Sequence, residues 1–215
     1  MLNFIGKAVT VLLLPFLAYG FGKAFYEVFA NRPWPAARVW PFLLGFASFA
    51  VFWLVFKRFL QPLCTFEHEL THLIVGLLFF KRPKSFSVTL SRGGSVELYG
   101  GQNFLVTLAP YFLPTVCYLL LPVAWFVPKE TLPLFFGILG GSAAFHLLSG
   151  WQEFHFGQSD LHEAGLVFSL LFLPVANLIF FGAVLSLIIG GNEKFFSFWK
   201  QGLANGLGGL WTLIN

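Results

Sequence analysis

The sequence predicts an all-α polytopic membrane protein with about six transmembrane helices and a short β-hairpin between the third and the fourth. Three observations support this fold class. Of the 215 residues, 57% are apolar and only 10% are charged, and the mean hydropathy is +0.78, whereas about a quarter of a soluble domain is charged. The apolar residues gather in segments long enough to cross a bilayer. One short stretch alternates apolar and polar residues with a period of two, as a strand does.

We expect residues 1–215 to form one transmembrane domain with its core at 62–190, because no composition shift marks a second domain. Apolar residues after Lys7 show no small-residue cleavage site, so this stretch is interpreted as an uncleaved first span. Cys64 and Cys117 lie in apolar segments and do not indicate a disulfide framework. The net charge of +4 is attributed to interfacial Lys and Arg beside the lipid bilayer, and no nucleic-acid partner is expected.

The first three spans are expected at residues 3–30, 39–60 and 62–80. Pro62 suits the first turn of the third helix, because a proline lacks the N–H that a first turn leaves unpaired. Residues 85–99 then alternate around Arg92-Gly93-Gly94, which predicts a β-hairpin with a glycine turn. An ordinary extramembrane loop is the alternative for this segment.

Three further spans are expected at 103–127, 131–150 and about 164–190. The stretch 151–163 between the last two is the most polar part of the second half. The tail 192–215 resembles an interfacial helix, because large apolar residues recur in it at a spacing of four, namely Trp199, Leu203, Leu207 and Trp211. No feature of the sequence indicates an oligomeric state.

The chemistry of the chain centres on Glu67-His68-Glu69-Leu70-Thr71-His72 in the third predicted helix. Positions i and i+4 of a helix lie on one face, so His68 and His72 can share one metal ion. Glu69, beside the first histidine, can reach a water molecule held by that metal. Two ordinary helix histidines without a metal are the alternative, but an ionisable cluster inside an apolar helix is costly and usually functional.

A catalytic zinc ion needs three protein ligands and one open position. The pattern that supplies the third from the same helix requires glycine at 75 and histidine at 78, where this chain has Val75 and Leu78. Asp160 is the only aspartate and lies at the start of the last span, although a carboxylate there can also serve a helix N-terminus. The candidates for the third ligand are Cys64, His146, Glu153, His155, Asp160, His162 and Glu163.

With these motifs the chain resembles the site-2 protease family of intramembrane zinc metalloproteases, in particular a compact, divergent bacterial branch. The resemblance covers about residues 62–175. It is carried by the histidine motif, by Arg92-Gly93-Gly94-Ser95-Val96, by Leu108-Ala109-Pro110-Tyr111 and by Gln158-Ser159-Asp160-Leu161. Many members have Asn-Pro before the aspartate, where this chain has Gln158-Ser159, so Gln158 or Asn103 would replace the asparagine that grips substrate.

The resemblance implies one zinc ion held by His68, His72 and Asp160, with Glu69 as the general base. It implies hydrolysis of a transmembrane protein substrate in the bacterial inner membrane. The hairpin edge would hold the substrate as an added strand. The residues expected to bind substrate are Gly93, Gly94, Ser95, Val96, His146 and Gln158.

Two other functions remain open from the sequence. A membrane zinc protease of the prenyl-protein or heat-shock type also carries this histidine motif, and it would use a glutamate as third ligand, with Glu153 or Glu163 as candidates. A zinc-binding, transport or scaffold protein without protease activity is the second alternative.

Overall fold

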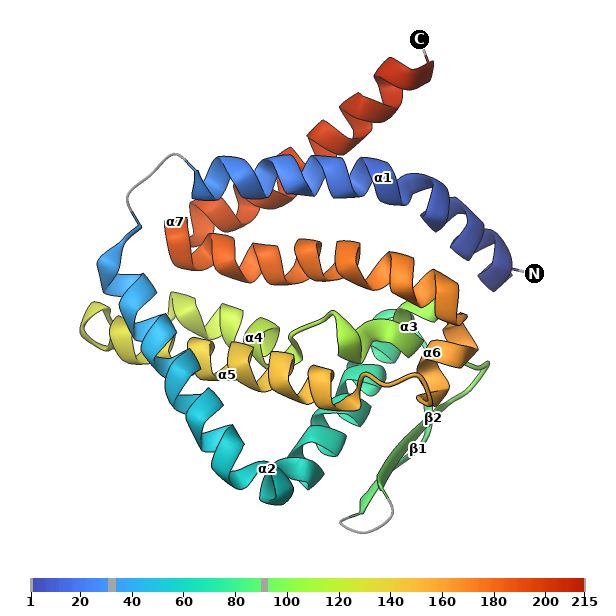
Figure 1. The fold of residues 1–215 in the computed structure, drawn as a ribbon, viewed down its shortest axis with the longest axis horizontal. Coiled ribbons are helices and arrows are strands. Elements are labelled where there is room, and N and C mark those ends of the chain that lie inside the picture. Colours follow the sequence, from blue (N-terminus) through green and yellow to red (C-terminus); the bar gives the residue numbers. More distant parts are fainter. Residues whose placement is uncertain (1, 31–33, 90–92, 215) are drawn as a thin grey trace.

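The computed structural model describes residues 2–30, 34–89 and 93–214 and is mostly helical (Figure 1). Four of its helices are long and apolar enough to cross a membrane, which suggests a multi-pass membrane protein. They are α1 (Leu2–Phe29), α2 (Ala36–Leu78), α5 (Leu132–Glu153) and α7 (Leu166–Ile214). A bent pair of shorter helices could supply a fifth span, so the described residues give four or five apolar spans where the sequence predicted about six.

The main difference lies in α2, which joins the predicted second and third spans into one helix. Figure 1 shows it bending sharply near its middle, where the colour bar gives residues near 60. Pro62 is inside the helix, so its expected place in the first turn of a new helix is wrong. A proline in a helix interior lacks the N–H of one backbone hydrogen bond and bends the helix without ending it.

The predicted fourth span, 103–127, is broken in the structure. Helix α3 (Phe104–Leu108) continues into the 3-10 helix η1 (Ala109–Tyr111), and the chain then turns by 89° into α4 (Thr115–Leu120) and the 3-10 helix η2 (Leu121–Trp125). Pro114 sits at the turn, where it disfavours a helical conformation for the residue before it. A third short 3-10 helix, η3 (Lys129–Thr131), precedes α5.

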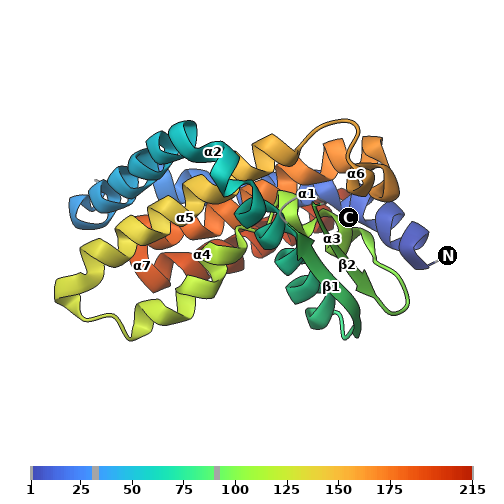
Figure 2. The ribbon, with the colours of Figure 1, turned by 90° about the horizontal axis from the view of Figure 1, so that it is seen from below.

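The predicted hairpin between α2 and α3 is confirmed as two antiparallel strands, β1 (Pro83–Thr89) and β2 (Gly93–Leu98). Val96 and Leu98 of β2 are buried, and a Cβ added at Gly76 of α2 would lie 2.4 Å from Leu98 Cδ1. Figure 2 accordingly shows the hairpin against the C-terminal arm of α2. The predicted turn residue Arg92 lies outside the described residues.

Close backbone contacts join α5 to the N-terminal arm of α2. A Cβ added at Gly45 would lie 1.9 Å from the Gly137 carbonyl oxygen, and one at Gly140 would lie 2.0 Å from the Phe42 carbonyl oxygen. Small residues at these positions let the two helices approach closely. The arms of α2 are thereby held in place, and the C-terminal arm carries the histidine motif.

The segment after Gly191 forms the second arm of α7. Gly191 has φ 67° and ψ −160°, which interrupts the helix, and Figure 1 shows the chain turning back there to run beside α1. Phe198 is fully buried against Phe21 of α1, with ring centroids 5.3 Å apart. The expected helix at 192–215 is present through Ile214, and its interfacial position stays a prediction.

Candidate metal centre

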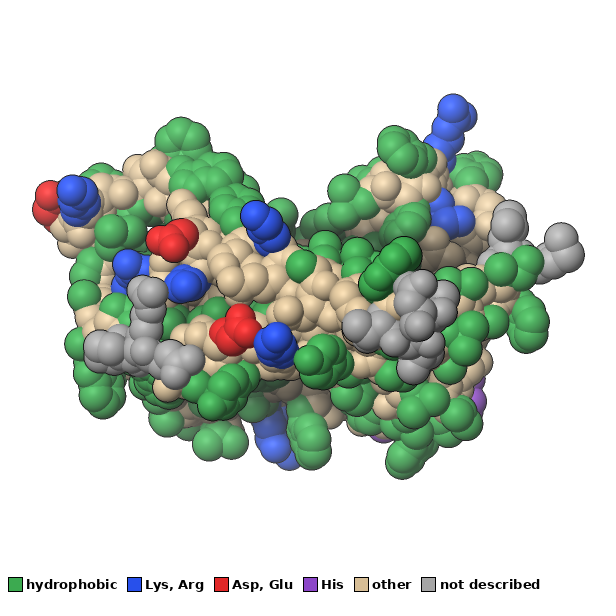
Figure 3. Space-filling view, turned by 90° about the horizontal axis from the view of Figure 1, so that it is seen from above, with side chains coloured by type: hydrophobic (Ala, Val, Ile, Leu, Met, Phe, Trp, Pro, Cys, Tyr) green, Lys and Arg blue, Asp and Glu red, His purple; other side chains and the backbone are tan. Residues whose placement is uncertain are grey.

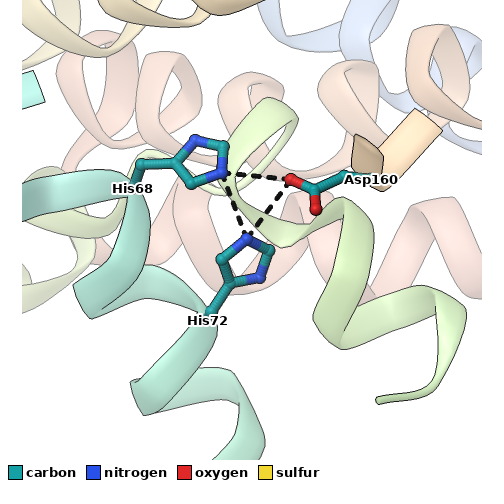
Figure 4. A group of neighbouring side chains, drawn as sticks. All are labelled: His68, His72 and Asp160. Carbon is teal, nitrogen blue, oxygen red and sulfur yellow. Dashed lines mark hydrogen bonds and ion pairs between the residues drawn. The ribbon is translucent and has the colours of Figure 1, made fainter. Parts of the chain in front are cut away.

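Three side chains from two helices converge on one point, as Figure 4 shows. His68 and His72 project from α2, and Asp160 projects from the six-residue helix α6 (Ser159–Ala164). The His68 Nε2 atom lies 3.1 Å from His72 Nε2 and 3.1 Å from Asp160 Oδ2, and His72 Nε2 lies 3.4 Å from Asp160 Oδ2. The structure therefore brings together the three residues expected to hold the metal.

The spacing of these atoms fits a bound metal ion. A tetrahedral zinc ion about 2.0–2.1 Å from each ligand places neighbouring ligand atoms about 3.3 Å apart. The three separations here span 3.1 to 3.4 Å. Both imidazoles are buried and the Asp160 side chain is 16% exposed, so the group could hold a metal ion in a largely buried site.

The outer nitrogens of both imidazoles have acceptors. His72 Nδ1 lies 2.9 Å from the Val106 carbonyl oxygen, and His68 Nδ1 lies 2.5 Å from Glu153 Oε2. We assign the imidazole protons to these Nδ1 atoms, because each then donates to an acceptor. Both Nε2 lone pairs then face the Asp160 carboxylate, and three electron-rich atoms at this distance are stabilised by a cation between them.

Tyr111 fixes the carboxylate of Asp160. Its hydroxyl donates to Asp160 Oδ2 at 3.2 Å, and its ring stands edge-on to the His68 ring with centroids 5.5 Å apart. The Asn177 amide donates to the Tyr111 carbonyl oxygen at 2.9 Å and anchors η1 to α7. Burial alone would raise the pKa of Asp160, but when His68 and His72 are protonated their hydrogen bonds and positive charge hold it below its usual range.

Glu69 lies beside the metal centre and under strand β2. Its half-buried side chain interacts electrostatically with both imidazoles and with Asp160. A Cβ added at Gly94 would lie 2.6 Å from Glu69 Cγ and 2.8 Å from Thr65 Cγ2. Only glycine therefore fits at position 94 with the strand backbone this close to the expected general base.

The expected substrate-binding residues lie in different environments. Gly93 and Ser95 are exposed on the hairpin, whereas Val96 is buried. Gln158 precedes α6 and hydrogen bonds to Tyr111. His146 is 3% exposed and lines a cavity of about 180 Å³ together with Tyr111, and its Nδ1 has no hydrogen-bond partner within the described part of the chain.

The other candidate ligands lie outside the converging group. Glu153 contacts the outer nitrogen of His68, and Cys64 Sγ donates to the Leu60 carbonyl oxygen. Asn103, considered as a substrate-gripping residue, caps α3 by accepting from the Val106 N–H at 2.9 Å. His146 is not part of the group, and the remaining candidates are exposed, namely His155, His162 and Glu163.

Sequence reasoning missed the supporting roles of Glu153, Tyr111 and the Val106 carbonyl. Glu153 was considered only as a ligand, although a carboxylate at the end of an apolar helix is also a natural partner for a buried histidine. No sequence pattern indicates which backbone carbonyl faces His72, because that depends on how α3 docks on α2.

Comparisons with protein-family models, curated proteins and solved structures find no match for this chain. We therefore infer the function from the residues of the metal centre and their surroundings.

Proposed function

We propose that this chain is an intramembrane zinc metalloprotease of the site-2 protease type, which hydrolyses peptide bonds of transmembrane proteins. The observation that carries the proposal is the convergence of His68 Nε2, His72 Nε2 and Asp160 Oδ2 within 3.1–3.4 Å, with both outer nitrogens already engaged. Two neutral imidazoles and one carboxylate are a ligand set used by catalytic zinc. Imidazole and carboxylate ligands suit zinc, and Glu69 beside the first histidine matches the motif of zinc hydrolases.

A zinc ion bound here would supply the positive charge that acidifies a water molecule and polarises a carbonyl. Glu69 takes the proton from that water as its oxygen attacks the scissile carbonyl carbon, and later delivers a proton to the leaving amine. The C–N bond breaks and yields a carboxylate and an amine. The position of Glu69 next to His68 and in electrostatic contact with both imidazoles supports this role.

The hairpin supports the proposed mode of substrate binding. The carbonyl groups of a transmembrane helix are already hydrogen-bonded, so a substrate must unwind before its backbone can be attacked. Because Gly94 places the backbone of β2 directly over Glu69, a peptide paired with this hairpin would lie extended beside the general base. Non-helical backbone at membrane depth is tolerated where protein buries it or where it lines a wet cavity.

The geometry favours an aspartate as third ligand over the glutamate of the prenyl-protein and heat-shock types. Glu153 is held on the outer nitrogen of His68 at 2.5 Å, and Glu163 is exposed. Neither belongs to the converging group, whereas Asp160 does.

The test combines metal content with cleavage of a model transmembrane peptide by the purified full-length chain. We expect one zinc ion per chain, and we expect Glu69→Gln to abolish cleavage while zinc stays bound. Glu130→Gln is the matched control: its side chain is exposed on η3 and does not belong to the converging group, so cleavage should persist. Full activity of Glu69→Gln would refute the proposed base, and stoichiometric zinc without any cleavage would favour a non-proteolytic zinc protein.

A further inference from the structure

A second polar cavity lies far from the metal centre, where the start of α2 meets the break in α7. Its volume is about 420 Å³, and its charged lining residues are Arg38, Glu193 and Lys194. Figure 1 shows this break at the opposite end of the molecule from α6. In Figure 3, charged side chains gather toward that end, while hydrophobic side chains cover much of the remaining surface.

The cationic groups of this cavity are not matched by close ion pairs in the described part of the chain. The Nη1 atom of Arg38 is shielded from solvent and has no hydrogen-bond partner among residues 2–30, 34–89 and 93–214. Within the same ranges neither Arg38 nor Lys194 forms an ion pair, although Glu193 lines the cavity. A shielded guanidinium nitrogen without a partner is costly, which points to an acceptor that occupies the cavity when the protein is in use.

Two glycines make room for these cations at the α7 break. A Cβ added at Gly191 would lie 2.9 Å from Arg38 Nη1, and one added at Gly190 would overlap the Lys194 side chain. Gly191 also has φ 67°, a conformation that other residues rarely adopt. The local sequence therefore places a guanidinium and an ammonium against one stretch of glycine backbone.

Helix ends add to the positive potential of the cavity. Helix α2 begins at Ala36 without a side-chain cap from Pro35, and the second arm of α7 begins just after Gly191. The first turn of a helix offers unpaired N–H groups and a partial positive charge, which favour anions. Trp34 and Trp40, exposed nearby on the chain, are typical of the depth at which lipid head groups lie.

From these observations we propose that the cavity binds a phosphate group, with the Arg38 guanidinium and the Lys194 ammonium as its main donors. The planar fork of an arginine matches two phosphate oxygens, and a lysine adds a point charge. Two sources share this chemistry, namely the head group of an anionic phospholipid and a soluble phosphate compound. This site is independent of the proposed protease activity.

The experiment measures the unfolding midpoint of the full-length protein in a mild neutral detergent during titration with three probes. These are dioleoyl phosphatidylglycerol, dioleoyl phosphatidylcholine and inorganic phosphate, and the midpoint shift gives an apparent Kd for each. We expect phosphatidylglycerol or phosphate to stabilise the wild type beyond phosphatidylcholine. Arg38→Gln should weaken that binding about tenfold, and Arg38→Lys should weaken it less.

Arg58→Gln is the matched control, because Arg58 is an exposed cation near the bend of the same helix. This variant should bind the anionic probes as tightly as the wild type does. Lys194→Gln repeats the test should Arg38→Gln fail to fold. If these variants lose the midpoint shift caused by phosphatidylglycerol, the ligand is a lipid head group. If they lose the shift caused by inorganic phosphate, the ligand is a soluble phosphate compound. Equal binding by wild type, Arg38→Gln and Lys194→Gln, or no preference for the anionic probes, would overturn the proposal.

Discussion

Glu153 contacts the outer nitrogen of the His68 imidazole, with its Oε2 atom 2.5 Å from Nδ1. The inner Nε2 of the same ring lies 3.1 Å from Asp160 Oδ2. A carboxylate on the outer nitrogen of a histidine fixes the tautomer and makes the inner nitrogen a stronger metal ligand. Glu153 ends α5, so the packing of α5 on α2 places the carboxylate that supports His68.

Glu153→Gln should therefore weaken zinc binding without removing a ligand. We expect a loss of roughly 10–100-fold in affinity, the usual effect of removing such a supporting group. Competition with a zinc chelator measures it, and Glu163→Gln, at an exposed position, should have no effect. An unchanged affinity in Glu153→Gln would show that the contact with His68 does not support the metal.

Gly94→Ala should lower peptide cleavage while zinc content stays at the wild-type level. A methyl group at this position would meet Glu69 and Thr65 at 2.6 and 2.8 Å, so the strand must shift away from the general base. We expect a loss of roughly 10–100-fold in kcat/KM, as for other small displacements of a reacting group. Ser87→Ala, on an exposed position of β1, is the control, and wild-type cleavage by Gly94→Ala would contradict the proposed role of the hairpin.

We expect acidification to release zinc because the histidines become protonated, and not because Asp160 does. Once His68 and His72 are protonated, their hydrogen bonds and charge hold the pKa of Asp160 below its usual value, so its carboxylate stays charged until the pH falls below the ordinary aspartate range. Protonation of imidazoles competes with metal directly, and the ordinary histidine pKa is about 6.5. Dialysis at pH 8, 7, 6 and 5 should show zinc loss between about pH 7 and 5. Retention of zinc down to pH 4 would contradict this order.

Gly140→Ala should destabilise the fold. Its Cβ would lie 2.0 Å from the Phe42 carbonyl oxygen, which is too close for α5 to stay packed on α2. We expect a loss of about 1–3 kcal/mol in the free energy of unfolding, the usual range for overpacking. Gly137→Ala is a close control on the same helix, because its Cβ would meet the Pro41 carbonyl oxygen at an ordinary 3.6 Å. Equal stability of the two variants would contradict the close packing.

Local pattern was enough to predict the hairpin and the pair of histidines. Period-2 alternation around glycine gave the two strands, and the i, i+4 spacing put His68 and His72 on one face. Asp160 followed from its position and from the family resemblance, because a contact across 92 residues leaves no local signal. The partners of the outer nitrogens depend on helix docking, which periodicity does not encode.

Proline bends a helix at one position of this chain and ends a helix at another, which explains the errors in the predicted transmembrane spans. The sequence predicts a helix start at Pro62, yet α2 continues through it, whereas Pro114 does mark a break inside 103–127. A proline can bend a helix whose remaining backbone groups stay hydrogen-bonded, or it can end the helix. Tertiary packing decides between the two, and a single sequence does not show that packing.

The pairing of α1 with α7 bears on how the chain matures. Among the described elements, α7 is the main partner of α1, and the ring of Phe21 is enclosed by Phe198 and Trp199 near the far end of the chain. Helix α1 therefore completes most of its packing only after α7 has been synthesised. A nascent chain arrested before α7 would consequently lack most of the contacts that hold α1 in the fold.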